Sequence, residues 1–296
     1  MMKLRRLAKS AAAFLPPGAE RRIKSVLAAR RDSGVIDALS QMGPTGALEN
    51  AACEICGGTI TAPHLTKHGF RIVRCVNDGL LFVSPRPADL SPYYNSRYYT
   101  GGVPGVYRSY DEHATDMRLK WESRLAELSK ASGGNGRLLD VGAASGQFLA
   151  LAIANGWDGM GIDLSEWAAE KARRVHHVNV VAGTLPDSRV PESSFDAATM
   201  WDCIEHLAEP RKVLEAVRRT LRPDGILALT TGALAHCDPR AVSGWYYPPW
   251  HLFYFARETV TALLNVAGFE VTAYSVDDKR SPFAVMTVIA RATPGS

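Results

Sequence analysis

The stretch from Arg137 to Leu149 constrains the fold of this chain more than any other segment. An apolar strand, Arg137–Val141, runs directly into a turn of small residues, Gly142–Gly146, and an apolar helix follows. A turn without bulky side chains lets the backbone approach a ligand closely, and the N-terminus of a helix offers unpaired N–H groups to an anion. The segment therefore predicts a strand–turn–helix unit that binds a nucleotide-type cofactor.

Strands and helices alternate from residue 136 onward. We expect strands at 137–141, 158–163, 178–182, 195–201 and 225–231, with helices at 145–155, 165–175 and 208–221. Such alternation predicts a parallel sheet with helices on both faces. A last helix at 257–267 is followed by two consecutive strands, 269–276 and 283–291. Two consecutive strands predict an antiparallel hairpin.

The chain of 296 residues divides into three predicted regions. Residues 1–50 form a basic arm and linker, residues 51–100 a cysteine-bearing module with a tyrosine-rich end, and residues 101–296 the α/β domain. No apolar run reaches the roughly 18 residues that a membrane-spanning helix needs. A composition that is 46% hydrophobic and 22% charged is ordinary for a soluble protein with a substantial core.

The N-terminal arm is strongly basic. Residues 1–31 hold many Lys and Arg residues against a single acid, Glu20. Its apolar piece, Ala11–Leu15, is too short for a secretory signal and ends at two prolines. The weakly amphipathic segment Arg22–Arg31 fits either contact with an anionic membrane surface or a solvated tail. We therefore expect a cytoplasmic protein. The basic arm also allows peripheral contact with the inner membrane face.

An acidic residue ends the second expected strand. Asp163 is placed to accept hydrogen bonds from ribose hydroxyls, which occur both in NAD and in S-adenosylmethionine (SAM). The turn reads Asp140-x-Gly142-x-x-x-Gly146, and it lacks the G-x-G-x-x-G spacing of a dinucleotide site. The fourth strand ends in Trp201 and Asp202, at the sheet edge where ligands of such folds bind.

These segments, with the Pro-Asp-Gly turn at 223–225 and the final hairpin, resemble the class I SAM-dependent methyltransferases over residues 110–292. The subgroup that the chain resembles acts on small molecules and sugars and carries an N-terminal cysteine module. The resemblance implies a seven-stranded Rossmann-like sheet of order 3-2-1-4-5-7-6 whose last strand is antiparallel. It also implies SAM as the cofactor.

The resemblance assigns roles to individual residues. The methionine part of SAM would contact Gly142, Ala143 and Gly146, with Asp140 orienting the turn or the amine. Asp163 would hold the ribose, and Leu164 and Thr184 would border the adenine. Trp201 and Asp202 would face the methionine part or the acceptor. For Leu164, Thr184 and Trp201, plain core packing is an equally good interpretation.

Methyl transfer to an alcohol requires removal of a proton, for which histidine is the usual base. The candidates are His206, after the fourth strand, and His251, which the resemblance places near the acceptor. Some relatives carry a glutamate just before the latter histidine, where this chain has Trp250. Structural roles for both histidines remain open. Tyr246, Tyr247 and Trp250 fit either an aromatic acceptor wall or core packing.

Cysteines gather before the tyrosine-rich stretch. Cys53-x2-Cys56 and Cys75-x2-Asp78 have the spacing of a zinc ribbon in which aspartate replaces the fourth cysteine. His64 or His68 could take the place of Asp78, and a metal-free remnant is the alternative. We expect a structural or lid-like role for this module. Tyr98 and Tyr99 would either reach the cofactor pocket or pack between domains.

The sequence therefore predicts a SAM-dependent methyltransferase that acts on a hydroxyl of a small molecule, sugar or glycolipid. The alternatives are C-methylation of a nucleotide sugar, rRNA methylation and SAM binding without catalysis. Nucleic acid is not expected as a partner, because the chain beyond residue 31 is slightly acidic and RNA binding needs an extended basic surface.

Overall fold

The computed structural model describes residue 44 and residues 46–94, 96–100, 110–234, 246–277 and 284–293. The basic arm at residues 1–31, with its expected membrane contact, lies outside these ranges. Within the described ranges, no helix combines the length and the apolar character that crossing a membrane requires.

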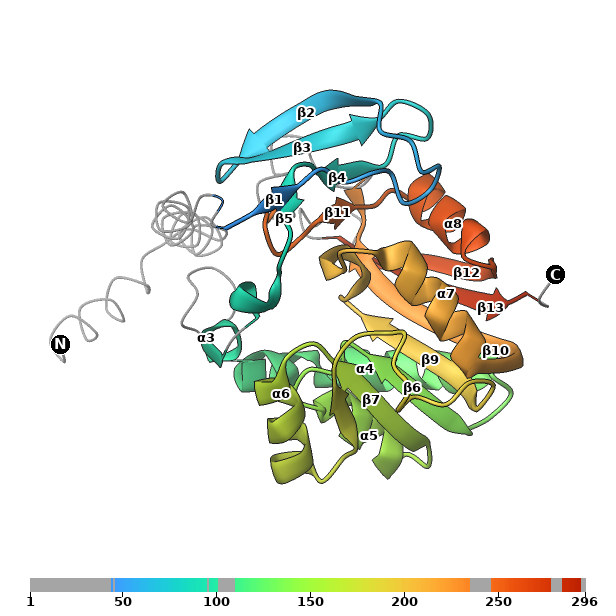
Figure 1. The fold of residues 1–296 in the computed structure, drawn as a ribbon. Helices are drawn as coiled ribbons and strands as arrows, with labels where there is room; N and C mark the ends of the chain where they lie inside the picture. The colour runs from blue at the N-terminus through green and yellow to red at the C-terminus, as the bar shows by residue number, and fades with distance from the viewer. Residues whose placement is uncertain are drawn as a thin grey trace, which may run out of the picture.

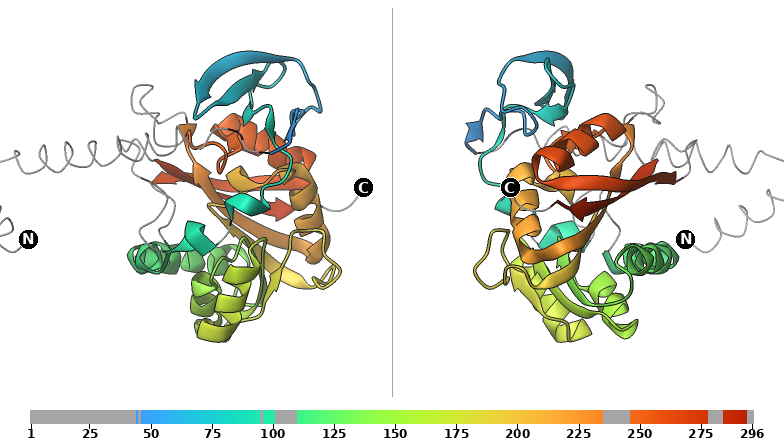
Figure 2. Two further views of the ribbon diagram at one scale, coloured as in Figure 1. Left: turned by 60° about the vertical axis from the view of Figure 1, so that its left-hand side comes forward. Right: turned by 90° about the vertical axis from the view of Figure 1, so that its right-hand side faces the viewer.

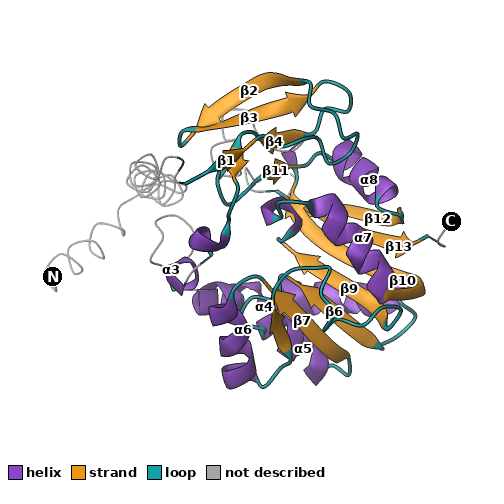
Figure 3. Ribbon diagram, viewed as in Figure 1, coloured by secondary structure: helices purple, strands orange, loops and turns teal. Residues whose placement is uncertain are grey.

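Seven strands form one mixed sheet (Figures 1 and 3). They are β6 (Arg137–Val141), β7 (Asp158–Asp163), β8 (Val180–Ala182), β9 (Phe195–Trp201), β10 (Leu221–Gly232), β12 (Phe269–Asp277) and β13 (Val285–Ala292). Their spatial order is β12-β13-β10-β9-β6-β7-β8. β13 is antiparallel to both of its neighbours, and the pairs among β6 to β10 are parallel. Counted from β6, this order is the expected 3-2-1-4-5-7-6, with the expected antiparallel strand.

Helices cover both faces of this sheet. They are α4 (Tyr110–Ala131), α5 (Gln147–Ala154), α6 (Glu166–Lys171), α7 (Pro210–Thr220) and α8 (Arg257–Val266). Adjacent residues of a strand point to opposite faces. In β6, Leu138 packs in a core with α4 and α5, whereas Leu139 belongs to the core that includes α7 and α8. Both leucines are fully buried, which explains why these strands are continuously apolar.

Two helix boundaries differ from the sequence prediction for local reasons. α5 begins at Gln147 instead of residue 145, because Gly146 adopts a left-handed conformation with φ of +79°. The helix expected at 165–175 is α-helical only to Lys171 and continues as a π-helical turn over Ala172–His176. The α-helix begins with Ser165, whose hydroxyl accepts a hydrogen bond from the Ala168 N–H.

A small antiparallel sheet carries the cysteine-bearing segment. It has the order β11-β4-β3-β2, in which β2 is Thr61–Lys67, β3 is Phe70–Cys75 and β4 is Leu81–Val83. Its fourth strand, β11 (Phe253–Tyr254), comes from the far end of the α/β domain and was not predicted. A separate pair joins β1 (Leu48–Glu49) to β5 (Arg86–Pro87), and a short α3 spans Ser96–Tyr99. Figure 2 shows the small sheet at one end of the molecule, beside α8.

The packing around Gly146 predicts a loss of stability on substitution. A Cβ atom at Gly146 would lie 2.7 Å from Val178 Cγ2 and 2.8 Å from Ala172 Cβ. At Gly133, whose φ of +76° is similar, a Cβ would meet nothing within 4 Å. Gly133→Ala should therefore cost only backbone strain, about 1–2 kcal/mol. Gly146→Ala should lose about 1–3 kcal/mol more, the usual cost of overpacking, in the free energy of urea unfolding. Equal losses in the two variants would contradict this packing.

Candidate functional site

A cavity of about 330 Å³ lies at the carboxyl ends of β6, β7 and β9. This is the edge of a parallel sheet at which ligands of such folds bind. Its walls come from the turn after β6, the ends of the neighbouring strands and the tyrosine-rich segment around α3. The strand–turn–helix unit that the sequence singled out therefore borders the cavity.

The turn after β6 is held in place by close packing. Gly142 has φ of +74°, and a Cβ atom there would lie 2.6 Å from the Cys203 sulfur. The N–H groups of Gly142 and Ala143 both donate to the Ile162 carbonyl, at 2.8 and 3.1 Å. The small residues thus bring the turn against β7 and against the segment after β9. Ala143 and Ala144 remain at the cavity wall.

Asp163 links this turn to two other segments. One carboxylate oxygen accepts from the Ala144 N–H at 2.8 Å. The other accepts from the Ser165 N–H at 2.8 Å and from the Tyr99 hydroxyl at 3.3 Å. Burial raises the pKa of Asp163, and these three hydrogen bonds partly offset the rise. The buried carboxylate is thus a well-anchored acceptor at the end of β7.

Asp140 is a second buried carboxylate in the cavity wall. It accepts a hydrogen bond of 2.8 Å from the Thr199 hydroxyl. Burial raises its pKa to about 7, with a smaller upward contribution from Asp163 and a downward one from Thr199. A carboxyl group in this position becomes fully ionised when a cation binds beside it.

The cavity is lined by most of the residues predicted for the cofactor. They are Asp140, Gly142, Ala143, Asp163, Leu164, Thr184, Trp201 and Asp202. Gly146 is not among the lining residues, contrary to the prediction that it contacts the methionine part of SAM, because it packs against Ala172 and Val178. Leu164 is 47% exposed, which disfavours a role in core packing.

The two candidate histidines lie together, but only His206 is among the residues that line the cavity. The rings of His206 and His251 are 4.7 Å apart and nearly perpendicular. The Nδ1 atom of His206 is 2.9 Å from the Trp250 carbonyl oxygen and 3.0 Å from the Tyr94 hydroxyl. Since a carbonyl only accepts, Nδ1 carries the hydrogen and Nε2 keeps its lone pair. Burial, and secondarily His251, hold the pKa of His206 well below its ordinary value.

Trp250 does not form an acceptor wall. It is only 2% exposed, and it packs edge-on against Tyr93. Tyr246 and Tyr247 are likewise absent from the cavity lining. Of the two interpretations left open for this aromatic group, core packing is the one that agrees with the structure.

Several lining residues were missed or left open by sequence reasoning. Tyr94, Tyr98 and Tyr99 line the cavity, as the tyrosine-rich stretch suggested without deciding. Met117 and Trp121 come from α4 and were not predicted. Apolar residues on a helix look the same in sequence whether they face a core or a cavity, so α4 offered no signal.

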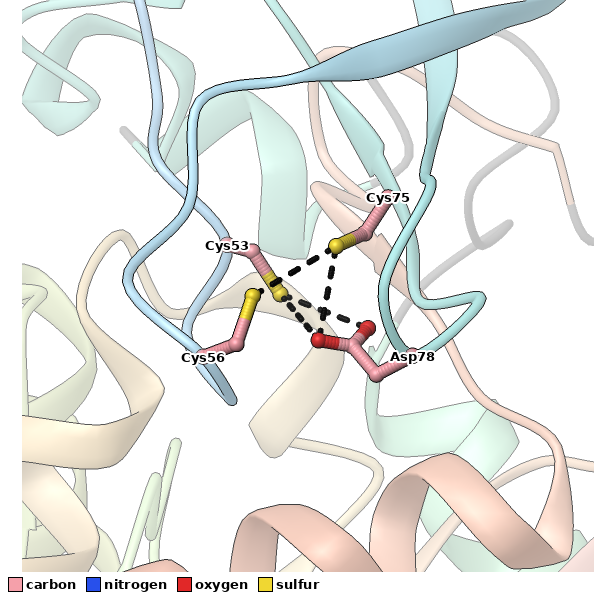
Figure 4. Close-up of side chains that lie close together, drawn as sticks. All are labelled: Cys53, Cys56, Cys75 and Asp78. Atoms are coloured by element: carbon pink, nitrogen blue, oxygen red, sulfur yellow. Dashed lines mark hydrogen bonds between the residues drawn. The ribbon is translucent and has the colours of Figure 1, made fainter.

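The cysteine-bearing segment brings its four predicted ligands together (Figure 4). Cys53 Sγ and Asp78 Oδ2 are 3.1 Å apart, Cys75 Sγ and Asp78 Oδ2 are 3.4 Å apart, and the sulfurs of Cys56 and Cys75 are 3.6 Å apart. All four ligand atoms lie within 4.8 Å of one another. Burial raises the pKa of Cys53, so its thiol is protonated when no cation is present.

The alternative ligands His64 and His68 lie elsewhere. His64 Nε2 is 2.8 Å from the Tyr246 hydroxyl, and neither histidine belongs to the cysteine cluster. In the described chain the group is therefore three cysteines and Asp78, as the spacing predicted.

A family model described as a methyltransferase domain matches residues 113–274, which is more than half of the chain. The chain belongs to this methyltransferase-domain family. Membership confirms the predicted methyltransferase domain, while the small-molecule subgroup and its cysteine module stay predictions. The residues that match the family model begin after the cysteine-bearing segment.

Curated relatives match parts of the chain. A ubiquinone biosynthesis O-methyltransferase from Paraburkholderia phymatum is 33% identical over 123 residues, covering 39% of this chain and 50% of that protein. The O-methyltransferase resE from Aspergillus sclerotiorum is 30% identical over 165 residues, covering 51% of this chain and 60% of that protein. The chain thus spans about half the length of the curated relatives it matches.

Solved structures resemble the fold at low identity. A 1,6-didemethyltoxoflavin-N1-methyltransferase from Burkholderia thailandensis, bound to its substrate and S-adenosylhomocysteine, is 20% identical with a TM-score of 0.48. That match covers 78% of this chain and 99% of the other. A possible histamine N-methyltransferase from Thermotoga maritima is 21% identical with a TM-score of 0.49, covering 62% of this chain and 95% of the other.

Proposed function

We propose that this protein binds SAM and transfers its methyl group to a hydroxyl oxygen of a small-molecule or sugar acceptor. One observation carries the assignment: a single cavity is lined by the glycine turn, by two buried carboxylates and by a histidine whose Nε2 lone pair is available. The first two features suit SAM, and the third suits an acceptor that must lose a proton.

The carboxylates fit the two polar ends of SAM. Asp163, at the end of β7, would accept from the ribose hydroxyls, with Leu164 and Thr184 beside the adenine. Asp140, in the strand before the turn, would face the positively charged methionine part. Burial is the main cause that raises the pKa of Asp140 to about 7, and a cation beside the carboxyl group would lower that pKa.

The reaction would be an in-line displacement. The acceptor oxygen forms a bond to the methyl carbon while the bond from that carbon to sulfur breaks, and the electron pair stays on sulfur to give S-adenosylhomocysteine. The acceptor's proton passes to a base, for which we propose His206 Nε2, with His251 packed behind it as a positioning residue. Most of the rate would come from alignment of the two reactants.

We also propose that Cys53, Cys56, Cys75 and Asp78 bind zinc. Three sulfurs and one carboxylate oxygen, drawn from two turns, are a donor set that Zn²⁺ accepts in tetrahedral sites. The site lies away from the cavity lining, so a bound ion would stabilise the small sheet.

Two observations support the proposed acceptor class. Both relatives described above are named O-methyltransferases, and the aromatic lining of the cavity suits an acceptor with an apolar face. A glycolipid at a membrane surface, reached through residues 1–31, is a further proposal that rests on the sequence alone.

The proposed function predicts which atom becomes methylated and which histidine matters. A panel of phenols, sugars, nucleotide sugars and matched amines, incubated with methyl-labelled SAM, should yield O-methyl products by mass spectrometry. His206→Ala should lower kcat by about 10²–10⁴-fold, because base catalysis is lost, while the Kd for SAM stays unchanged. His176→Ala, which lies outside the cavity, should be neutral. Label on a carbon or nitrogen atom of an acceptor, or on RNA added to the same panel, would contradict O-methylation of a small molecule.

SAM affinity should depend on pH through Asp140. Below its pKa of about 7 the carboxyl group is protonated, and it must release that proton when the cationic ligand binds. The association constant, measured by calorimetry, should therefore rise by up to about tenfold per pH unit from about pH 5.5 and level off above pH 7. Thr199→Val should move the midpoint upward, since Thr199 lowers that pKa. Affinity that falls as pH rises over this range would refute the role of Asp140.

Zinc binding predicts a metal content of one per chain. Protein purified without chelator should contain one zinc ion by elemental analysis, and Cys56→Ser should lower both this content and the melting temperature. Cys203→Ala, a change in a buried cysteine outside the cluster, should retain the ion. Because the thiols must lose protons, zinc should also dissociate as pH falls. Zinc content near zero in the unmodified protein would rule out the site.

A further inference from the structure

A second cluster of metal-ligating side chains adjoins the cavity. Glu205 and His206 lie in a short 3-10 helix, Ile204–His206, just after β9, and His251 lies in the loop before β11. One ligand atom from each residue falls within 4.8 Å of the other two. The two segments are fixed to each other by the Leu252 N–H, which donates to the Glu205 carbonyl oxygen at 2.8 Å.

The burial of Glu205 is the observation that suggests a bound cation. The residue is 2% exposed, and neither carboxylate oxygen forms a well-aligned hydrogen bond among the described residues; Thr231 makes only the last and smallest contribution to its pKa. An ionised carboxylate in such a place is costly, and proteins usually pair it with a cation. Burial first, and then Asp202, raise the pKa of Glu205 to about 8. The local surroundings of Glu205 thus favour a positive charge beside it.

The histidines complete a donor set. The Nδ1 atom of His206 donates to the Trp250 carbonyl, so Nε2 is its coordinating atom. Metal-bound histidines commonly donate their second nitrogen to a backbone carbonyl in this way, which fixes the ring and the tautomer. His206 also lines the cavity, so a cation held at Nε2 would border the acceptor's space.

We propose that Glu205, His206 and His251 bind one divalent transition-metal cation at the acceptor end of the cavity. Two imidazoles and one carboxylate suit Mn²⁺, Fe²⁺, Co²⁺ or Zn²⁺ better than Mg²⁺ or Ca²⁺, which prefer all-oxygen sites. Three protein ligands leave coordination positions for water or for an acceptor oxygen.

This inference rests on the proposed function for its role. With the cation bound, Nε2 of His206 is a ligand, and the charge of the cation lowers the pKa of the acceptor hydroxyl in place of a free imidazole base. The proton then leaves to solvent or buffer, and the methyl transfer itself is unchanged. The cation would thus activate an oxygen acceptor through the same residues that the proposed function places there.

The test is titration of the full chain with Mn²⁺ after one equivalent of zinc has been added, which the cysteine cluster takes first because thiolates favour Zn²⁺, so that the proposed site stays open. Electron paramagnetic resonance of free Mn²⁺ gives stoichiometry and Kd, and Mn²⁺ has little affinity for thiolate sites. One Mn²⁺ per chain is expected, with affinity at least tenfold weaker in both Glu205→Gln and His251→Ala. His176→Ala, which lies outside both clusters and outside the cavity lining, should bind Mn²⁺ like the unmodified chain.

Folding and SAM binding are measured on the same samples. Far-ultraviolet circular dichroism must match the unmodified chain, and Glu205→Asp serves as a second variant if Glu205→Gln fails to fold. No Mn²⁺ binding at millimolar concentration, or binding that survives in both ligand variants, overturns the metal site. If SAM still binds in that case, the proposed function stands and only the proposed metal site is rejected. If the unmodified chain does not bind SAM, the proposed function is rejected whatever the Mn²⁺ result.

Discussion

The buried carboxylate of Asp163 ties together the parts of the site. It receives hydrogen bonds from the turn after β6, from the first N–H before α6 and from a tyrosine of α3. Because losing any of these hydrogen bonds would be costly for a buried carboxylate, these three segments have little freedom relative to the end of β7. The turn, the strand end and the tyrosine-rich segment therefore lie around one cavity. Their fixed arrangement positions the other side chains that line it.

The sheet could be predicted from the sequence because its signals are local. Continuous apolar runs such as Ile226–Leu229 mark strands that are buried on both faces, and the glycine turn marks the end of the first strand. The proximity of Cys53, Cys56, Cys75 and Asp78 was predicted for the same reason, since two short turns supply these residues in pairs. The strand order followed from the resemblance, whereas the antiparallel pairing of β12 with β13 also followed from the two consecutive strands at the end of the pattern.

Contacts between distant segments could not be predicted in the same way. Gly146 was given a ligand role, yet its small size is required by Ala172, in a later helical turn, and by Val178, in the loop that follows it. The histidine at 251 was expected at the acceptor, but the chain places it beside His206 and outside the cavity lining. No feature of the sequence around Glu205 indicated that its carboxylate would be buried without a well-aligned hydrogen bond. Each of these facts depends on residues far away in the chain.

The pairing of β4 with β11 has a consequence for the order in which the protein can fold. Phe82 and Phe253 face each other across this pair, although roughly 170 residues separate them in the chain. During synthesis the cysteine-bearing strands emerge well before β11, and β4 then presents an unpaired edge and an unburied aromatic side chain. Contacts of such high sequence separation form late and slowly. The small sheet is thus completed by a segment that is made long after its other strands, and until then it exposes a surface on which aggregation can begin.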